Sequence, residues 1–234
     1  MTRPIPFLAP DPVGFPPATE ALEDPEGLVA AGGALTLEWL VAAYSSGIFP
    51  WYNSDSEPIL WWSPAERAVL KPGAMRVPRS LRKRLRNAGF SVSMDTDFEA
   101  VIRACAAPRP DAGGTWITPT MQQAYINLHH AGLAHSVETW LDGELVGGLY
   151  GVSIGSSFFG ESMFSHTSDA SKVAFYHLQK QLQAWHFNCI DCQLENPHLM
   201  TLGVTMVSRE AFLSELNHNN QAQTRLGRWR LDAQ

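Results

Sequence analysis

Long hydrophobic runs are missing from this 234-residue chain, and no stretch approaches the roughly 20 apolar residues that span a bilayer. The first residues, MTRPIPFLAPDP, lack the apolar core of a secretory signal peptide. We therefore expect a cytoplasmic protein without a membrane partner. The length allows one large domain, with or without a small one beside it.

Cysteine is scarce, with only Cys105, Cys189 and Cys192. Three cysteines are few, and an uneven number cannot all pair within the chain. This count argues against a disulfide scaffold and favours a reducing compartment. Cys189 and Cys192 form one CxxC pair, which is compatible with zinc or redox chemistry. We favour the alternative of two small thiols buried in an apolar strand. We predict no metal site and no cofactor.

Acidic residues are absent from one interval, positions 67–86, although the chain as a whole has a net charge of −6. Eight of the 17 basic residues lie in this interval: Arg67, Lys71, Arg76, Arg79, Arg82, Lys83, Arg84 and Arg86. One basic segment on an acidic protein predicts a single polyanion-binding surface. The alternative is a solvated helix face, but no interleaved acid is available to pair with these residues.

The segment from 133 to 193 has the clearest pattern of secondary structure. Alternating apolar residues predict three antiparallel strands, at 136–141, 145–154 and 158–164. Asp142-Gly143, between the first two, is typical of a tight hairpin.

A helix and a last strand follow these strands. Ser168-Asp169 is a candidate N-cap, and the helix carries Phe175, Leu178, Leu182 and Trp185 on one apolar face. A buried strand is predicted at 189–194. The pattern predicts an α+β fold, and we expect domains at 1–62, which begins with a proline-rich arm, and 63–234.

Helix signals outside this segment are also clear. Thr36, Thr118 and Ser208 are candidate N-caps, and 79–88 is predicted as a helix with Leu81 and Leu85 inward and its basic residues outward. Trp51, Trp61 and Trp62 lie within 12 positions. Each is a candidate for core packing or for stacking on a nucleobase.

Several motifs, in order along the chain, resemble one family. They are GGALTLEWLVAAYSSGIFPW (32–51), WWSP (61–64), GTWIT (114–118), HSVETW with LVGGLYGV (135–152), FFGESMFS (158–165), ASK (170–172) and IDCQ with HLMTLG (190–203). Together they resemble the leucyl/phenylalanyl-tRNA–protein transferases. The resemblance implies a small N-terminal α/β domain and a larger acetyltransferase-like (GNAT-like) domain with a mixed, mostly antiparallel sheet flanked by helices.

The resemblance also implies an activity and its partners. Members move Leu, Phe or Met from aminoacyl-tRNA to proteins that begin with Lys or Arg, which marks those proteins for degradation. Trp51 and Trp116 match the aromatics that hold the terminal adenosine of the tRNA. The amino-acid pocket falls at Leu149, Phe158, Phe175, Leu178, Leu182 and Ile190, and each of these is equally a candidate for simple core packing.

Glu161, Asp191 and Gln193 match the residues that handle the accepting amine and the ester. Asp191 and Gln193 are two apart on the predicted strand, so their side chains should leave the same face. Because an amide is not a strong base, we interpret Gln193 as positioning the amine and Asp191 as orienting it. Asp191 is also a candidate for favouring the positively charged first residue of the acceptor. Glu161 is the alternative acceptor contact, and the other interpretation of Asp191 and Gln193 is a structural one.

No sequence signature of a catalytic nucleophile is present, since there is no GxSxG and no Cys beside a plausible His. An aminoacyl ester is already activated and needs mainly orientation, which is worth about 7–11 kcal/mol. Arg79, Arg82, Lys83, Arg84 and Arg86 are the residues we expect to contact the tRNA backbone.

Three alternatives remain open at this point. An acetyl-CoA-dependent acetyltransferase would need a glycine-rich pyrophosphate turn before its main helix, but the corresponding turn, 165–169, has no glycine and contains an acid. A transferase acting on cell-wall precursors would use the same donor. A non-catalytic module would bind aminoacyl-tRNA without forming an amide.

Overall fold

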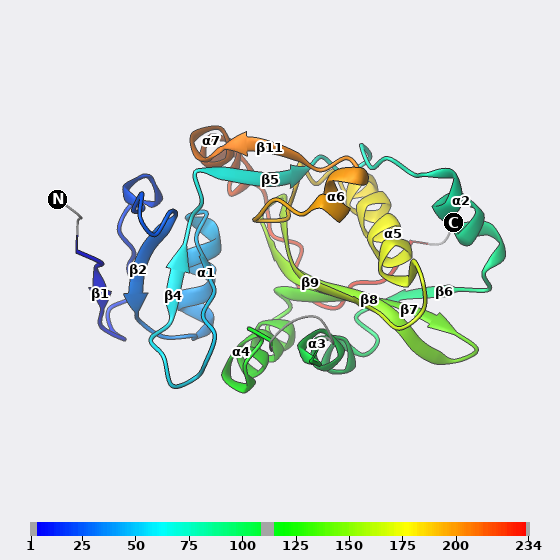
Figure 1. The fold of residues 1–234 in the computed structure, drawn as a ribbon, viewed down its shortest axis with the longest axis horizontal. Helices are drawn as coiled ribbons and strands as arrows, with labels where there is room; N and C mark the ends of the chain where they lie inside the picture. Colours follow the sequence, from blue (N-terminus) through cyan, green and yellow to red (C-terminus); the bar gives the residue numbers. More distant parts are fainter. Residues whose placement is uncertain (1–3, 109–114, 233–234) are drawn as a thin grey trace.

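The structure of the chain is a computed structural model that describes residues 4–108 and 115–232. Within these residues, two β-sheets lie beside one another along the long axis of the molecule (Figure 1). The smaller sheet has the strand order β1-β2-β4-β3. Its strands are β1 (Phe7–Leu8), β2 (Leu28–Gly32), β4 (Leu60–Trp62) and β3 (Phe49–Pro50).

The larger sheet has the order β11-β5-β10-β9-β8-β7-β6. In that order its strands are Thr205–Ser208, Glu66–Leu70, Cys189–Asp191, Ser157–Ser165, Glu144–Ile154, Ala134–Leu141 and Ser91–Met94. β9 and β10 run parallel, and the other neighbouring pairs run antiparallel. The predicted α+β fold with a mixed, mostly antiparallel sheet is confirmed.

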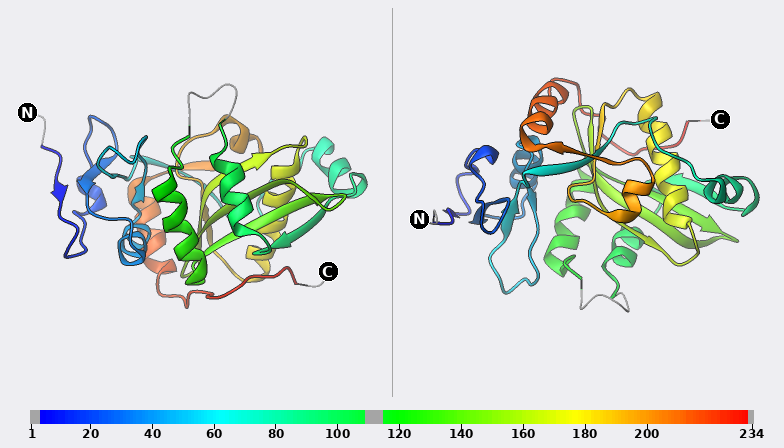
Figure 2. Two further views of the ribbon diagram at one scale, coloured as in Figure 1. Left: turned by 90° about the horizontal axis from the view of Figure 1, so that it is seen from below. Right: turned by 45° about the horizontal axis from the view of Figure 1, so that its top comes forward.

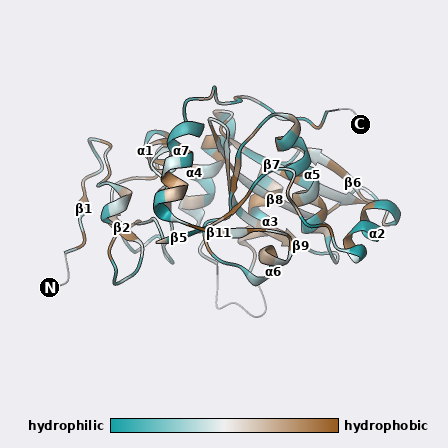
Figure 3. Ribbon diagram, turned by 90° about the horizontal axis from the view of Figure 1, so that it is seen from above, coloured by the Kyte–Doolittle hydropathy of each residue, from teal (hydrophilic) through white to brown (hydrophobic). Residues whose placement is uncertain are grey.

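Helices cover both faces of the larger sheet (Figure 2). α3 (Phe98–Ala106) and α4 (Pro119–His130) pack on one face, and α5 (Ala170–Ala184) packs on the other. α2 (Arg79–Asn87) contacts α5 at the edge of the molecule and is strongly hydrophilic (Figure 3). The short α6 (Pro197–Thr201) and α7 (Arg209–Asn219) follow late in the chain.

The smaller sheet packs against α1 (Leu37–Ser45), which begins after Thr36. One buried cluster runs from Trp39 and Tyr44 in this part of the chain to Tyr125 and Tyr150 in the larger part. Although β4 ends at Trp62, the hydrophobic core is therefore continuous across this point. The division into 1–62 and 63–234 stays a prediction.

Most of the local signals act as expected. The side chains of Thr36, Thr118 and Ser208 each accept a hydrogen bond from a first-turn backbone N–H of the following helix. Asp142 (φ 51°) and Gly143 (φ 82°) make the tight turn between β7 and β8. None of the helices within residues 4–108 and 115–232 has the length and apolar character needed for crossing a lipid bilayer.

The N-cap of α5 differs from the prediction. Asp169 occupies the N-cap position in a left-handed conformation (φ 66°), and its side chain makes no capping bond. Its carboxylate instead pairs with Lys172 at 2.6 Å, while Ser165 Oγ accepts the Ser171 N–H at 2.8 Å. A side chain from β9 thus caps this helix, which no local pattern in 168–169 can reveal.

The last predicted strand is also different. β10 ends at Asp191 instead of 194, and Gln193 has a left-handed backbone with φ 56°. The prediction that Asp191 and Gln193 leave one face of a strand is therefore wrong. The chain turns here because Gln193 N–H bonds to the Asp191 carboxylate at 2.9 Å instead of continuing the ladder with β9.

Candidate active site

Strands β9 and β10 pair only from Ser157↔Cys189 to Phe159↔Asp191, and then part. A cavity of about 940 Å³ opens at this point. Its walls include positions 160–165 of β9 and positions 192–196 beyond β10. The fold therefore creates the cavity by separating two adjacent strands.

A β-bulge in β9 gives Glu161 its position. Tyr150 pairs with Ser162 and Gly151 pairs with Gly160, so Glu161 is the extra residue of the bulge. A Cβ on Gly151 would lie 2.2 Å from the carbonyl oxygen of Phe159, so only glycine fits here. A bulge changes the direction in which a side chain points, and here it places the Glu161 side chain in the wall of the cavity.

Most of the predicted amino-acid pocket lies together. Leu149, Phe158, Phe175, Leu178 and Ile190 all line the cavity, and each is buried. Leu182 does not line it, although it is one turn beyond Leu178 on α5. Its side chain is fully buried in the core on that side of the sheet.

The two predicted adenosine-stacking residues also reach the cavity. Trp51 follows β3 and is 40% exposed, and Trp116 lies in the segment before α4. The Trp62 ring lies 5.9 Å from that of Trp51, and Trp62 Nε1 donates to the Trp51 carbonyl at 2.8 Å. Trp61 is instead fully buried and packs in the core. Gly114 of the GTWIT motif lies outside the described residues.

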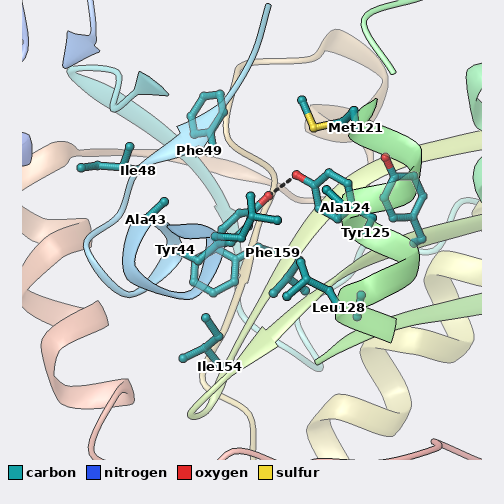
Figure 4. Packing of buried hydrophobic residues seen from close by; sticks show 14 of the residues in the cluster. Ala43, Tyr44, Ile48, Phe49, Met121, Ala124, Tyr125, Leu128, Ile154 and Phe159 are labelled. Atoms are coloured by element: carbon teal, nitrogen blue, oxygen red, sulfur yellow. Dashed lines mark hydrogen bonds between the residues drawn. The ribbon is translucent and has the colours of Figure 1, made fainter. Parts of the chain in front are cut away.

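Two tyrosines that were not predicted as site residues hold the Glu161 carboxyl group. The Tyr44 hydroxyl from α1 donates to Oε1 at 2.7 Å, and the Tyr125 hydroxyl from α4 donates to Oε2 at 2.9 Å. The two hydroxyls are also hydrogen-bonded to each other (Figure 4). Gln193 Nε2 donates to Oε1 at 3.3 Å.

The ionisation of Glu161 depends on burial and on these two tyrosines. Both hydroxyls donate to the carboxyl group, which favours its ionised form. Burial raises the pKa of Glu161 to about 7, while the hydrogen bonds from both tyrosines act to lower it. The carboxyl group can therefore gain or lose a proton near neutral pH.

Asp191 is held differently. Arg67 donates from Nε to Oδ1 at 2.9 Å and from Nη2 to Oδ2 at 2.7 Å. Both side chains are buried, with exposures of 1% and 0%. The interpretation of Arg67 as part of a basic segment without an acidic partner is wrong, since its partner is 124 positions away along the chain.

The remaining basic residues lie largely in solvent. On α2, Leu81 is buried and Leu85 is partly buried, while Arg79, Arg82, Lys83 and Arg86 lie on the outward side of the helix. Arg84 lies 3.9 Å from Asp169, near the first turn of α5. Because Ser165 and Ser171 beside that turn line the cavity, the basic surface approaches its rim.

The cysteine pair lies beside the site. Cys189 is buried, Cys192 is partly buried, and both are free thiols. Burial raises the pKa of both well above the usual value, which disfavours the reactive thiolate. No group of three or more metal-ligating side chains occurs within residues 4–108 and 115–232.

Comparison with known proteins gives consistent matches. The family model described as leucyl/phenylalanyl-tRNA protein transferase matches residues 69–217, and the model of its N-terminal domain matches residues 33–65. The leucyl/phenylalanyl-tRNA–protein transferase of Azoarcus sp. is 58% identical over 212 residues, 91% of this chain and 89% of that protein.

The transferase of the same name from Aromatoleum aromaticum is 55% identical over 225 residues, 96% of this chain and 94% of that protein. Among solved structures, a GCN5-related N-acetyltransferase from Kribbella flavida is similar at a TM-score of 0.37 and 14% identity, over 70% of this chain and 58% of that one. The sequence matches extend over both sheets and the cavity, and the chain belongs to the leucyl/phenylalanyl-tRNA protein transferase family.

Proposed function

We propose that this protein transfers Leu, Phe or Met from aminoacyl-tRNA to the N-terminal α-amine of proteins that begin with Lys or Arg. Such transfer marks the accepting protein for degradation. The single observation that carries the proposal is the arrangement of the cavity, where an apolar wall meets the polar cluster around Glu161. Because aminoacyl-tRNA is a cytoplasmic substrate, a cytoplasmic location is part of the proposal.

The apolar wall accepts the side chain of the esterified amino acid. Leu149, Phe158, Phe175, Leu178 and Ile190 offer no charge and no hydrogen-bonding side chain. Such a slot discriminates by shape, with about 1–3 kcal/mol for each methylene. Trp51 and Trp116 provide flat apolar surfaces at the same cavity, which suits the terminal adenosine.

The polar cluster receives the accepting amine. A neutral α-amine attacks the ester carbonyl carbon, a C–N bond forms, and the C–O bond to the terminal ribose breaks. The nitrogen then loses a proton, and the ribose oxygen gains one. Glu161, with a pKa of about 7, accepts the proton, and the Gln193 amide positions the amine.

The tRNA backbone lies along α2. Arg79, Arg82, Lys83 and Arg86 face outward, and Arg84 is near the cavity rim. Basic side chains in such a row bind phosphates without reading sequence. The rest of the acidic protein repels the polyanion, which favours this one surface.

A direct assay tests the proposal. The protein is incubated with Phe-tRNA and a peptide beginning with Arg, and the peptide mass is measured. We expect an increase by one phenylalanyl residue, and no increase for the same peptide acetylated at its N-terminus. Binding of aminoacyl-tRNA without any product would favour the non-catalytic module.

The same assay separates the other enzymes. Transfer from acetyl-CoA in place of Phe-tRNA would favour an acetyltransferase, and transfer to a cell-wall precursor but not to the peptide would favour the third alternative. The turn before α5 argues against the acetyltransferase, because Asp169 places a carboxylate where a pyrophosphate would bind.

A further inference from the structure

Arg67 is a buried cation whose contacts join separate parts of the fold. Besides the two bonds to Asp191, its Nη1 donates to the carbonyl of Gly47, just after α1, at 3.0 Å. Its guanidinium carbon lies 4.8 Å from the ring centre of Phe49 and 4.6 Å from that of Phe212. A planar cation between two rings and a bidentate carboxylate is fixed in orientation as well as in position.

The bonds to Arg67 determine what Asp191 can do. Oδ2 accepts from Arg67, and Oδ1 accepts from both Arg67 and the backbone N–H of Gln193 at 2.9 Å. The side chain is 0% exposed and is not among the described residues that line the cavity. Its charge is balanced within the protein, so it is not available to a substrate.

Gln193 is the cavity-lining residue that depends on this pair. Its left-handed backbone, with φ 56°, is held by the bond from its N–H to Asp191. Strand β5 secures the same turn, since Ala68 N–H donates to the Gln193 carbonyl at 3.2 Å and Cys192 N–H donates to the Ala68 carbonyl at 2.8 Å. The Gln193 amide consequently faces Glu161.

We propose that Arg67 is a positioning residue for aminoacyl transfer, acting through Asp191 to fix Gln193 beside Glu161. Asp191 belongs to the same positioning unit and contacts no substrate. This inference rests on the proposed function and adds Arg67 to its machinery. Of Glu161 and Asp191, Glu161 is then the one that faces the accepting amine.

A charge-neutral exchange distinguishes this arrangement from a direct role of the Asp191 charge. Asp191→Asn leaves the Arg67 cation buried and unpaired, which should disturb the turn. We expect kcat to fall about 100-fold, as for other misplacements of about 1 Å, with a smaller change in KM.

The double variant R67Q/D191N restores neutrality and keeps an oxygen at position 191 for the Gln193 N–H. Its kcat should recover at least about 10-fold relative to Asp191→Asn, in the manner of coupled sites.

The result that overturns the inference is a double variant as slow as Asp191→Asn while both have the thermal stability of the parent. The Asp191 charge would then act on substrate.

If Asp191→Asn does not fold, a second test uses Arg67→Lys in the Gln193→Ala background. A residue that acts through the Gln193 side chain causes no further loss of kcat there, whereas an additive loss overturns the inference. Absence of product with the unmodified protein would instead refute the proposed function, so the two failures are distinct.

Discussion

The Tyr44 hydroxyl on α1 donates a 2.7 Å hydrogen bond to Glu161 on β9, which joins the N-terminal part of the chain to the cavity of the larger sheet. Tyr125 contributes the second hydroxyl from α4, which bonds the other oxygen of the same carboxyl group. Burial raises the pKa of both tyrosines well above the usual value, so both remain neutral donors. The cluster therefore contains one titrating group near neutral pH, and this can be tested.

Removing either tyrosine hydroxyl should raise the pKa of Glu161. Hydrogen bonds from both residues favour the ionised carboxylate, and each is worth about 1.5 kcal/mol. That corresponds to about one pKa unit. For Tyr44→Phe and Tyr125→Phe we expect the acidic limb of kcat/KM for transfer to move about one unit towards higher pH. The limb is measured with a peptide acceptor whose α-amine pKa is known.

Tyr150→Phe is the matched control for this prediction. Its hydroxyl is buried in the same cluster and has no hydrogen-bond partner within the described residues. The limb should stay in place in this variant. A shift of equal size in all three variants would show that loss of packing, and not loss of a donor, is responsible.

The stability of the protein should depend on the ionisation of Glu161. Its folded-state pKa is raised from 4.5 to about 7, so the folded state binds the proton more tightly than the unfolded state does. The contribution of this group to the free energy of unfolding is therefore fully present below pH about 4.5 and is lost as the pH rises towards about 7.

Glu161→Gln removes that dependence. Between about pH 5 and about pH 7.5, a range set by these two pKa values, the thermal midpoint of the variant should fall less than that of the parent. Subtracting the fall in thermal midpoint of the variant from that of the parent removes the contributions of all other titrating groups, because both proteins share them. Equal falls in both proteins would mean that Glu161 is ionised throughout the range.

The local signals of the sequence predict most of the elements, because N-caps and hairpin turns depend on neighbours in the chain. Thr118-Pro119 begins α4 and Asp142-Gly143 turns β7 into β8 for that reason. The five cavity-lining apolar residues among the six predicted follow from the family resemblance and lie together. Leu182 differs because periodicity identifies the apolar face of α5 but not where the cavity ends along it.

The residues that sequence reasoning missed are those held by long-range contacts. Tyr44 and Tyr125 follow the predicted N-caps Thr36 and Thr118, but their meeting at Glu161 depends on how α1 and α4 approach β9. The partner of Arg67 is equally remote. The hydroxyl group of Tyr44 is the one indication in the sequence, because it lies on an otherwise apolar helix face and a buried hydroxyl requires a hydrogen-bond partner.

The basic helix should control the salt dependence of tRNA binding. Replacing Arg82, Lys83, Arg84 and Arg86 by Ala should reduce the slope of log K against log salt by up to about 3, at about 0.7–0.9 for each phosphate that is no longer neutralised. Binding is measured with charged tRNA over a series of salt concentrations. Arg228→Ala with Arg230→Ala removes two exposed cations near the C-terminus and should leave the slope unchanged. An unchanged slope in the helix variant would return α2 to the interpretation of a solvated face.

Two leucines on α5 separate the shape of the cavity from the stability of the core. Leu178 lines the cavity and Leu182 does not, although both are buried, with exposures of 1% and 0%. Changing either to Ala should destabilise the fold by about 2–5 kcal/mol. Only Leu178→Ala enlarges the slot, so only that variant should change the ratio of kcat/KM for Phe-tRNA over Leu-tRNA, by about 10-fold or more. The ratio is measured in one mixture containing both donors, which makes it independent of the fraction of folded protein. A similar change in Leu182→Ala, or none in Leu178→Ala, would contradict the assignment of this wall to the amino-acid side chain.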